Sequence, residues 1–335
     1  MSTLSGLAAV KGVLVDAVPR DGTAVLNADD PLVARMARRC DGRVIYFSMQ
    51  TRKGQEGYDR VDGHCAAGAA LRWLLVDSPE GELLALRQGP RTMPLIHAHL
   101  IPATLDGRAR MNVANALAAA AACWAAGAHL HDIRQGLRTF TTSFFQAPGR
   151  LNELDVRGFK VVIDYSHNVD GMRQLAEFVR LTMTGYGRRR GAAARGADGA
   201  QSEGAWQGRA IGVIGIPGDR RDEDMREDGA IAATAFDELY VREDANLRGR
   251  RPGETAAIVL EGVRAARAAG ARCARADAVL DELEAAERGI RRAQPGDLVV
   301  ICADDSTAVY RAAMAFDRGS GVAITAPGEL SVPEG

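Results

Sequence analysis

The chain has 335 residues, of which 47% are hydrophobic and 25% charged, and this length predicts two globular domains. Lys and Arg number 42 against 43 Asp and Glu, so the net charge of -1 gives no general attraction to nucleic acid or to an anionic membrane. The five cysteines are scattered without a CxxC pair, which argues against a disulfide framework or zinc site and favours a reducing compartment, the cytoplasm.

Two further compositional features concern targeting. The N-terminus lacks a basic segment followed by an apolar core, so we expect no signal peptide. The longest apolar stretch, Val113–Ala128, is mostly alanine, which contributes little to transfer into lipid. We therefore expect it to be a buried helix rather than a membrane span.

The first elements of the chain are predicted from its apolar runs. Residues 1–11 favour a short helix, and Gly12–Val18 favours a strand. A turn at Arg20–Gly22 would join that strand to Thr23–Leu26 in a hairpin-like pair.

An Asx-rich break, Asn27–Pro31, precedes the next helix. Asp29 or Asp30 would cap it, with the proline in its first turn. The helix continues to about Arg39, and a strand follows at Val44–Phe47. Whether these aspartates only cap the helix or also bind a ligand stays open.

The next stretch is predicted to be a loop followed by a hairpin. Residues 50–64 are polar and contain glycine, whereas Leu71–Val76 and Leu83–Leu86 flank a turn and predict paired strands. His97 and His99 have a spacing that a metal can use, but no third ligand has a matching spacing. We favour a structural role for them over a metal site.

Two asparagines open a long alanine-rich helix that begins near Met111 and ends near Gly127. Asn112 and Asn115 are three residues apart and share one helix face. One of them could serve only as a cap, but asparagine is a poor helix former. Its amide can match both the donor and the acceptor of an adenine edge, so this pair is a candidate nucleotide contact.

A domain boundary is predicted in the linker that follows a short amphipathic helix at His131–Thr139. We place the first domain at residues 1–145, the second at 146–321 and a tail at 322–335. The second domain alternates strands and helices, which indicates a doubly wound α/β fold. Its expected strands are Leu151–Val156, Phe159–Asp164, Ala210–Gly215, Glu238–Val241 and Asp297–Ala303. Its expected helices are Asp170–Thr184, Asp224–Phe236, Glu254–Ala269, Val279–Ala293 and Ser306–Phe316.

Polar groups gather where one of these strands passes into a helix, within Gly149–Met172. The apolar strand ends at Asp164, and Tyr165, Ser166, His167 and Asn168 follow at once. Ligands of open α/β sheets bind beyond the carboxyl ends of the strands, so this junction is a candidate site. Alone, each residue has a simpler interpretation, such as a helix cap for the aspartate.

Two glycine-containing segments interrupt the second domain. Residues 185–208 are rich in Gly, Ala and Arg and are predicted to be a flexible insertion whose arginines are solvated. The other segment, Gly212–Asp224, follows a strand and precedes a helix, where glycines allow backbone N–H groups to approach an anion. There is no G-x-G-x-x-G fingerprint of a Rossmann oxidoreductase.

Together these pieces resemble the Mur ligases, and within that superfamily the carboxy-terminal part of cyanophycin synthetase. The resemblance spans nearly the whole chain. It is carried by the phrases LNADDPLVARMA, IPATLDGRARMNVANALAAAAA, QAPGRLNELDV, VIDYSHNVDGM, GVIGIPGDRRDED, REDANLRGRRPGE and PGDLVVICADD. It implies a partial Mur ligase central domain followed by a Rossmann-like Mur ligase C-terminal domain.

The resemblance also implies roles. Mur-type ligases use ATP and Mg²⁺ to convert a carboxylate into an acyl phosphate, which an amine then attacks. In cyanophycin synthetase this half is taken to attach L-arginine to aspartate side chains of an Asp/Arg polymer. Nucleotide contacts would come from six residues: Asn112, Asn115, Arg150, Asp164, Tyr165 and Asn168. Catalytic roles would fall to His167, Arg220 and Arg221, and no residue is assigned as a metal ligand.

The sequence departs from the family in one respect, because it contains no G-x-x-G-K-[ST] P-loop to hold phosphates and Mg²⁺. The ATP-grasp half of cyanophycin synthetase is also absent. We therefore expect no independent ligase activity. Either a partner chain carries the missing parts, or the protein is a non-catalytic module that binds nucleotide or polymer. A homo-oligomer is compatible with the resemblance.

Overall fold

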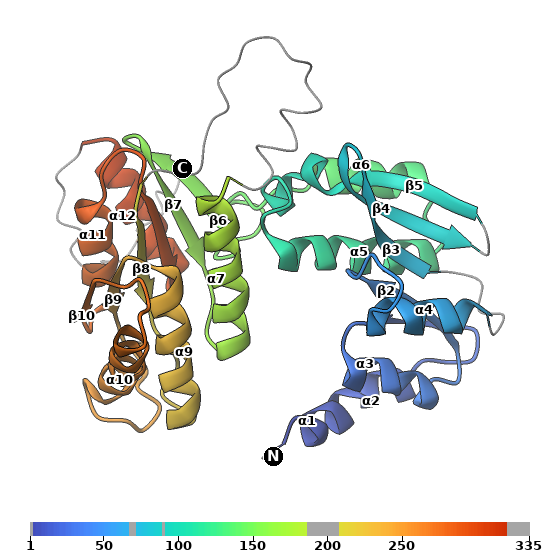
Figure 1. Ribbon diagram of the computed structural model, residues 1–335, viewed down its shortest axis with the longest axis horizontal. Coiled ribbons are helices and arrows are strands. Elements are labelled where there is room, and N and C mark those ends of the chain that lie inside the picture. Colours follow the sequence, from blue (N-terminus) through green and yellow to red (C-terminus); the bar gives the residue numbers. More distant parts are fainter. Residues whose placement is uncertain (1–2, 67–71, 89–90, 186–207, 320–335) are drawn as a thin grey trace, which may run out of the picture. The chain divides into compact units, whose positions relative to one another are not determined.

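The computed structural model describes residues 3–66, 72–88, 91–185 and 208–319, which form two compact units (Figure 1). Among the described residues, unit 1 comprises those up to Thr141 together with 184–185, and unit 2 comprises Thr142–Met183 and those from 208 onward. Most of the predicted insertion 185–208 and the predicted tail 322–335 lie outside the described residues.

Unit 1 contains a five-stranded sheet in the order β1-β2-β3-β4-β5. The strands are β1 (Thr23–Asn27), β2 (Arg43–Ser48), β3 (Arg72–Ser78), β4 (Gly81–Gln88) and β5 (Arg91–His97). The first three are parallel and the last three antiparallel. The alanine-rich helix α5 (Arg110–Ala125) packs on β1, β2 and β3, because its small side chains permit close approach to the sheet.

The remaining helices of unit 1 surround this core. The α-helices are α1 (Leu4–Lys11), α2 (Val13–Asp16), α3 (Pro31–Arg35), α4 (Glu56–Ala66) and α6 (Leu130–Thr139). The 3-10 helices are η1 (Met36–Arg39), η2 (Ala98–Leu100) and η3 (Pro102–Thr104). Asp30 caps α3 by accepting hydrogen bonds from Leu32 N (2.7 Å) and Val33 N (3.1 Å).

Two predictions in unit 1 are wrong. The expected strand Gly12–Val18 is largely α2, with only Val15 of that helix buried, and β1 pairs in parallel with β2 instead of forming a hairpin. The Arg39 side chain holds the helical arrangement by donating to Asp16 and to Ala9 O. The expected loop at 50–64 contains α4, a polar helix that buries Val61.

Unit 2 is a doubly wound α/β domain with a six-stranded sheet in the order β10-β9-β8-β11-β7-β6. The strands are β6 (Asn152–Val156), β7 (Phe159–Asp164), β8 (Ala210–Ile214), β9 (Glu238–Val241), β10 (Arg275–Ala278) and β11 (Leu298–Cys302). All neighbours are parallel except β6 with β7. The central strands are fully buried, as expected for a parallel sheet covered on both faces.

Helices cover both faces of this sheet (Figure 1). They are α7 (Val169–Met183), α9 (Asp222–Ala235), α10 (Glu254–Ala268), α11 (Glu282–Arg292) and α12 (Ser306–Asp317). Helix α9 packs against both α7 and α10, and α11 packs against α12. The sequence missed β10, a short strand with no buried residue, and placed the start of α11 too early, at Val279.

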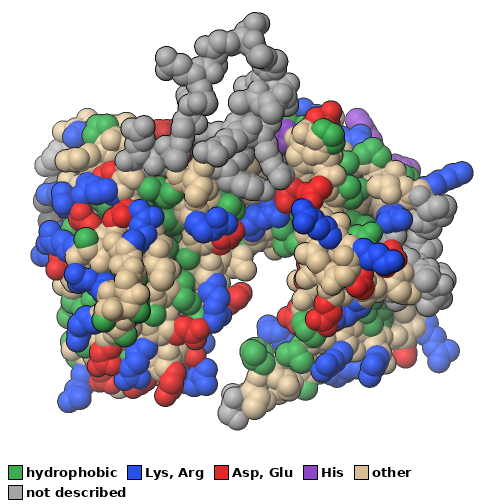
Figure 2. Space-filling view, viewed as in Figure 1, with side chains coloured by type: hydrophobic (Ala, Val, Ile, Leu, Met, Phe, Trp, Pro, Cys, Tyr) green, Lys and Arg blue, Asp and Glu red, His purple; other side chains and the backbone are tan. Residues whose placement is uncertain are grey.

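Charged side chains of both signs are interspersed over the face shown in Figure 2. Among the described residues no helix is long and apolar enough to cross a membrane.

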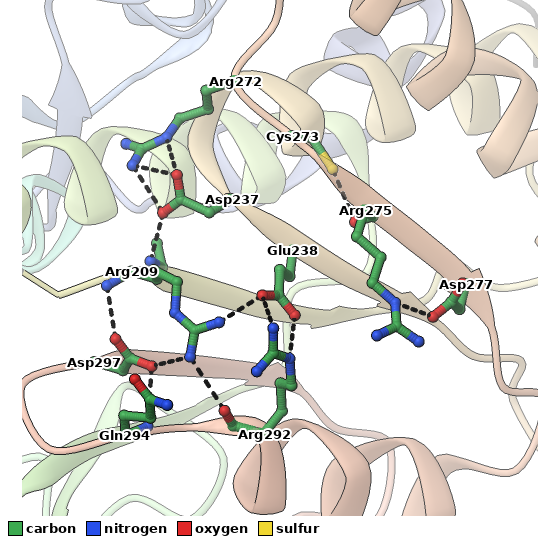
Figure 3. A network of polar contacts seen from close by, with 11 residues as sticks. Arg209, Asp237, Glu238, Arg272, Cys273, Arg275, Asp277, Arg292, Gln294 and Asp297 are labelled. Atoms are coloured by element: carbon green, nitrogen blue, oxygen red, sulfur yellow. Dashed lines mark hydrogen bonds and ion pairs between the residues drawn. The ribbon is translucent and has the colours of Figure 1, made fainter.

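A network of ion pairs joins the amino ends of β8, β9 and β11 (Figure 3). The buried carboxylate of Asp297 accepts from Arg209 N (2.8 Å), Arg209 Nη2 (2.7 Å) and Gln294 N (3.0 Å). Arg209 also donates to Glu238, which pairs in addition with Arg292. The network lies at the edge opposite the strand carboxyl ends, so we assign it a structural role.

Asp297→Asn is expected to lower the free energy of unfolding of unit 2 by about 1.5–3 kcal/mol at pH 7. Burial raises the pKa of Asp297, but hydrogen bonds from Arg209 and Gln294 outweigh it, so the pKa lies below its ordinary value. The stabilisation is therefore present above the pKa of the unfolded chain and is lost as pH falls toward the folded pKa. Urea unfolding of both variants between pH 7 and pH 3 should show the difference shrinking.

The matched control is Asp277→Asn in the same network, because the Arg275–Asp277 pair is solvent-exposed. That change should cost less than about 0.5 kcal/mol. Equal losses for the two variants would contradict a structural role for the buried carboxylate.

Candidate functional site

The carboxyl ends of β7, β8, β9 and β11 meet at one edge of the sheet in unit 2, because these strands are parallel. The segments that follow them carry the residues predicted from the sequence. This edge is therefore the candidate site of unit 2.

Asp164 ends β7 and is tied to the turn that precedes β6. Its Oδ2 accepts from Leu151 N at 3.0 Å. Burial raises the pKa of Asp164, while the hydrogen bond from Leu151 and the nearby Arg150 guanidinium act against it. Leu151 has a positive φ of 50°, and Gly149 one of 68°, so the turn has a specific shape. The predicted pair Arg150 and Asp164 is thus brought together.

The side chains of Arg150, Tyr165 and His167 lie next to one another beside this carboxylate. The Arg150 guanidinium carbon lies 5.2 Å from the centre of the Tyr165 ring, and the rings of Tyr165 and His167 are 5.0 Å apart. His167 Nδ1 lies 2.9 Å from Tyr165 O. A carbonyl oxygen only accepts, so a hydrogen bond at this distance has Nδ1 as its donor, and Nε2 takes no part in it.

Asn168 has a structural function that the sequence prediction did not assign to it. Its Oδ1 accepts from Gly171 N at 2.8 Å, in the first turn of α7. This is the hydrogen bond of a helix cap. The amide oxygen of Asn168 is therefore engaged within the protein.

The loop between β8 and α9 holds Arg220 and Arg221. Arg221, the residue before α9, pairs with Asp224 of that helix at 2.6 Å and is largely exposed. The Arg220 side chain is partly buried, and its Nε is a buried atom without a hydrogen-bond partner among the residues described. Of the two, Arg220 is therefore the better candidate to meet a ligand at this edge.

Arg250 organises this loop, although the sequence prediction gave it no role. It donates to Gly218 O (3.0 Å), to Arg220 O (3.1 Å) and to Asp222 (2.7 Å). A Cβ on Gly218 would lie 2.3 Å from Leu247 O, so the two loops are in close contact. The only sequence signal was the phrase REDANLRGRRPGE, noted for its resemblance.

Arg242, at the end of β9, is a second residue that the prediction missed. Its side chain is 3% exposed and contacts Asp244, while Nη2 lies 3.2 Å from Glu282. Nη2 also donates to Cys302 O at 2.8 Å. A Cβ on Gly215 would lie 2.7 Å from Arg242 Nε, so a larger residue there would displace the Arg242 side chain. Buried charges of this kind connect the loops after β9 and β11.

Unit 1 has its own candidate site, a pocket of about 570 Å³. Asn112 and Asn115 line it, together with mainly apolar residues of α5 and α6. Asn112 Nδ2 donates to Ala103 O at 2.7 Å, which fixes its amide, and Asn115 Nδ2 lies 3.3 Å from Asn112 Oδ1. Asn115 is exposed. The pocket offers apolar walls and an amide edge, which suits a planar heterocycle such as adenine.

The two aspartates whose role was open are now distinguished. Asp30 caps α3, whereas Asp29 accepts from Ser48 Oγ (2.6 Å) and from Met49 N (2.7 Å) at the carboxyl ends of β1 and β2. Asp29 therefore joins two strand ends of unit 1. His97 and His99 stack with ring centres 5.4 Å apart, and His97 lies 3.2 Å from Glu80.

The two candidate sites, each taken by itself, suit different chemical groups. The amide-edged pocket fits a base, and the Asp164 carboxylate is suited to hydroxyl donors. For the triphosphate and Mg²⁺ the chain has no P-loop, and no three His, Cys, Asp or Glu side chains in the described ranges gather as metal ligands. These residues therefore do not account for the phosphate end.

Comparison with known proteins agrees with this fold. The bifunctional folylpolyglutamate synthase/dihydrofolate synthase of Yersinia pestis, solved with AMPPNP and a Mn ion, matches with a TM-score of 0.56 and 18% identity. The match covers 92% of this chain and 56% of that one. A UDP-N-acetylmuramoyl-L-alanyl-D-glutamate--2,6-diaminopimelate ligase of Gloeobacter violaceus is 29% identical over 76% of this chain and 42% of its own length. No protein-family model matches the chain.

In fold the chain is Mur-ligase-like, and its sequence is similar to that of a Mur ligase. In sequence it is similar to cyanophycin synthetase: that of Crocosphaera subtropica is 37% identical over 308 residues, which are 92% of this chain and 31% of the relative. The chain thus spans about a third of the length of the cyanophycin synthetases that it matches.

Proposed function

We propose that this chain is the part of an ATP-dependent amide ligase of the cyanophycin synthetase type that binds the nucleotide base and ribose and positions the amino-acid substrate. The complete reaction would join the α-amine of L-arginine to aspartate side chains of an Asp/Arg polymer, in the cytoplasm. The observation that supports this most is the cluster of Arg150, Asp164, Tyr165 and His167 at the carboxyl end of β7. The name and 37% identity of the Crocosphaera relative supply the reaction type.

Each side chain has a defined part in this proposal. ATP supplies the phosphoryl group that activates the carboxylate. Asp164 accepts hydrogen bonds from ribose hydroxyls, and Arg150 neutralises negative charge beside it. His167 Nε2 takes a proton from the ammonium group of the amino acid, and the neutral amine that results is the nucleophile. Arg220, with its unpartnered Nε, stabilises charge that develops on the reacting oxygens.

Activity is proposed to need a partner chain that carries the phosphate-binding loop, because phosphoryl transfer depends on positioning and on neutralising phosphate charge. The test is ATP- and arginine-dependent phosphate release with a synthetic Asp–Arg primer. We expect no turnover by the isolated chain. Turnover by this chain alone would show that the P-loop is dispensable and the proposal wrong.

Asn115→Leu is expected to weaken ADP binding about tenfold, because the base loses an amide edge worth roughly 1.4 kcal/mol. Isothermal titration with ADP measures the effect. Gln135→Leu is the control, since Gln135 is an exposed residue of α6 outside the pocket lining. If both variants bind ADP like the unaltered chain, adenine does not occupy this pocket.

A second candidate is a non-catalytic nucleotide-binding protein. The observation that favours it is the base-sized pocket of unit 1 in a chain without a P-loop. If this candidate is correct, the chain binds ADP but shows no arginine-dependent turnover, even when a partner chain with a phosphate-binding loop is added.

A further inference from the structure

Unit 2 carries a cluster of three aromatic side chains, one of which is exposed to solvent. Phe144 stacks on Tyr310 of α12, with ring centres 4.0 Å apart and 15° between the ring planes. Phe145 stands steeply to both, with its ring centre 6.2 Å from that of Phe144 and 6.3 Å from that of Tyr310. Phe145 is 86% exposed, so most of its ring meets solvent. We call these three residues the aromatic platform.

The segment that carries both phenylalanines is held in place by a buried side chain. Asn152, which is 1% exposed, accepts a hydrogen bond from Gly149 N at 2.7 Å. Its Nδ2 donates to Thr142 O at 2.7 Å and to Ala147 O at 2.8 Å. These bonds fix both ends of residues 142–149. The fold therefore presents an apolar ring to solvent from a constrained segment, and covering that ring with a ligand would release free energy that folding has not used.

The aromatic platform borders the candidate site of unit 2. Ser306, the first residue of α12, lies four positions before Tyr310 and therefore on the same helix face. A Cβ on Gly149 would lie 3.2 Å from Ser306 Cβ and 3.9 Å from Tyr165 Cβ. Gly149 thus separates the start of α12 from the first residue after β7. A ligand on the platform would lie close to the carboxyl edge that holds Tyr165 and His167.

The ligand that suits an open aromatic face beside this site is a planar cation. The face of an aromatic ring attracts positive charge, and a guanidinium group also stacks on it. Unit 2 makes this contact twice within the protein. The guanidinium carbon of Arg150 lies 5.2 Å from the centre of the Tyr165 ring. That of Arg157 lies 4.5 Å from the centre of the Phe316 ring. The platform offers the same kind of surface to a group outside the protein.

Negative charge near the platform favours a cationic ligand. Asp304 and Asp305 lie just after β11 and are exposed. Glu282 accepts hydrogen bonds from their backbone N–H groups at 2.7 and 2.8 Å, which fixes their position. Tyr310 follows Asp305 by five positions, a rise of roughly 7.5 Å along the helix axis. Salt at physiological strength screens charges over roughly 8 Å, so these carboxylates would attract a cation on the platform.

We propose that the aromatic platform binds a guanidinium group of the peptide substrate, which stacks on Phe145 while Asp304 and Asp305 supply negative charge. This inference rests on the proposed function, in which the polymer carries arginine side chains on its aspartates. One such side chain would lie on the platform while another aspartate of the same polymer lies at the carboxyl edge of β7. Free L-arginine has the same guanidinium group, so the test must separate the two sources.

The test is isothermal titration of the 335-residue chain with four probes, in the absence of nucleotide. Two probes are synthetic tetra-aspartates that carry either arginine or citrulline on every side chain, since citrulline has the shape of arginine without its charge. The other two are unmodified tetra-aspartate and free L-arginine. We expect the arginine-bearing peptide to bind, and the citrulline-bearing and unmodified peptides to bind at least about fivefold more weakly, because the contacts of the platform act on charge.

Phe145→Leu should weaken binding of the arginine-bearing peptide about fivefold, because it removes the ring and keeps an apolar side chain. Phe145→Trp should bind at least as tightly as the unaltered chain, since tryptophan gives the strongest contact of this kind. Asp304→Asn should weaken binding about twofold. Leu280→Ala is the control, because Leu280 is an exposed apolar residue elsewhere in unit 2, and it should change nothing. Circular dichroism verifies that the variants fold.

Three results would overturn the proposal: no binding of the arginine-bearing peptide, equal binding by Phe145→Leu and the unaltered chain, or an equal loss in Phe145→Leu for the arginine and citrulline peptides. Self-association that Phe145→Leu abolishes would also overturn it, because a second copy would then cover the ring. Binding of free L-arginine that depends on Phe145 as strongly as peptide binding does would retain the guanidinium site and assign it to the amino-acid substrate.

The result is separable from that of the proposed function, because the titration contains no nucleotide. Peptide binding through Phe145 by a chain that does not bind ADP would retain the platform and reject the proposed function. ADP binding that depends on Asn115, without any effect of Phe145→Leu on peptide binding, would do the reverse.

Discussion

Arg242→Met is expected to lower the free energy of unfolding of unit 2 by about 3–5 kcal/mol, because it removes one partner from a buried ion pair. Arg242 is 3% exposed and lies between Asp244 and Glu282, while Cys302 O accepts two of its hydrogen bonds. Without the guanidinium, the carboxylates of Asp244 and Glu282 lose the positive charge that lies between them. Denaturant unfolding followed by circular dichroism measures the loss.

Arg251→Met is the matched control, since Arg251 is 90% exposed and pairs only at the surface with Glu254. It should change stability by less than about 0.5 kcal/mol. The double variant Arg242→Met/Asp244→Leu should be more stable than Arg242→Met, because one orphaned charge is removed. If the double variant is less stable than Arg242→Met, the Asp244 carboxylate is not the cause of the stability lost in Arg242→Met.

Asp228→Asn is expected to abolish a pH dependence of stability that amounts to about 4 kcal/mol in total. Asp228 lies on α9, is 2% exposed, and its Oδ2 has no hydrogen-bond partner among the residues described. Burial raises its pKa from 3.8 to about 7. One pKa unit corresponds to roughly 1.36 kcal/mol, so the rise from 3.8 to about 7 gives the stated total.

The sign follows from proton binding. Between the unfolded pKa near 3.8 and the folded pKa near 7, the folded state holds a proton that the unfolded state has lost. Stability of the unaltered chain therefore falls by roughly 1.4 kcal/mol per pH unit across this range and levels off above pH 7. Asp228→Asn should remove this slope. The stability of the variant minus that of the unaltered chain should therefore be larger at pH 8 than at pH 5.

Glu223→Gln, an exposed change on the same helix, serves as the comparison and should leave the slope intact. Urea unfolding at pH 5, 6, 7 and 8 is sufficient to measure all three slopes. An unchanged slope in Asp228→Asn would mean that another group titrates in this range.

The sequence predicted the fold of unit 2 well where patterns were strong. Buried parallel strands such as β8 and β11 are continuous apolar runs, and α7 has a clear helical period. β10 was missed because a short edge strand with no buried residue has no such pattern. In unit 1, Gly12–Val18 looked like a strand because its valines favour one, but tertiary contacts of Arg39 hold it helical.

The candidate site was predictable only in part. Asp164, Tyr165 and His167 directly follow an apolar strand, so their position at a sheet edge could be derived from the sequence. Arg242 and Arg250 could not be found in the same way, because arginine is common at surfaces and their partners are distant in the chain. The capping role of Asn168 depends on the local turn, which residue type alone does not specify.

The contacts of Arg250 bear on how this protein could be altered by design. Its guanidinium binds the backbone of the loop after β8 while its own backbone belongs to the loop after β9. If only one of the two loops were replaced by that of a relative, the hydrogen bonds from Arg250 to the backbone carbonyls of Gly218 and Arg220 would be lost. A design that exchanges these loops should therefore transfer residues 215–222 and 242–254 together.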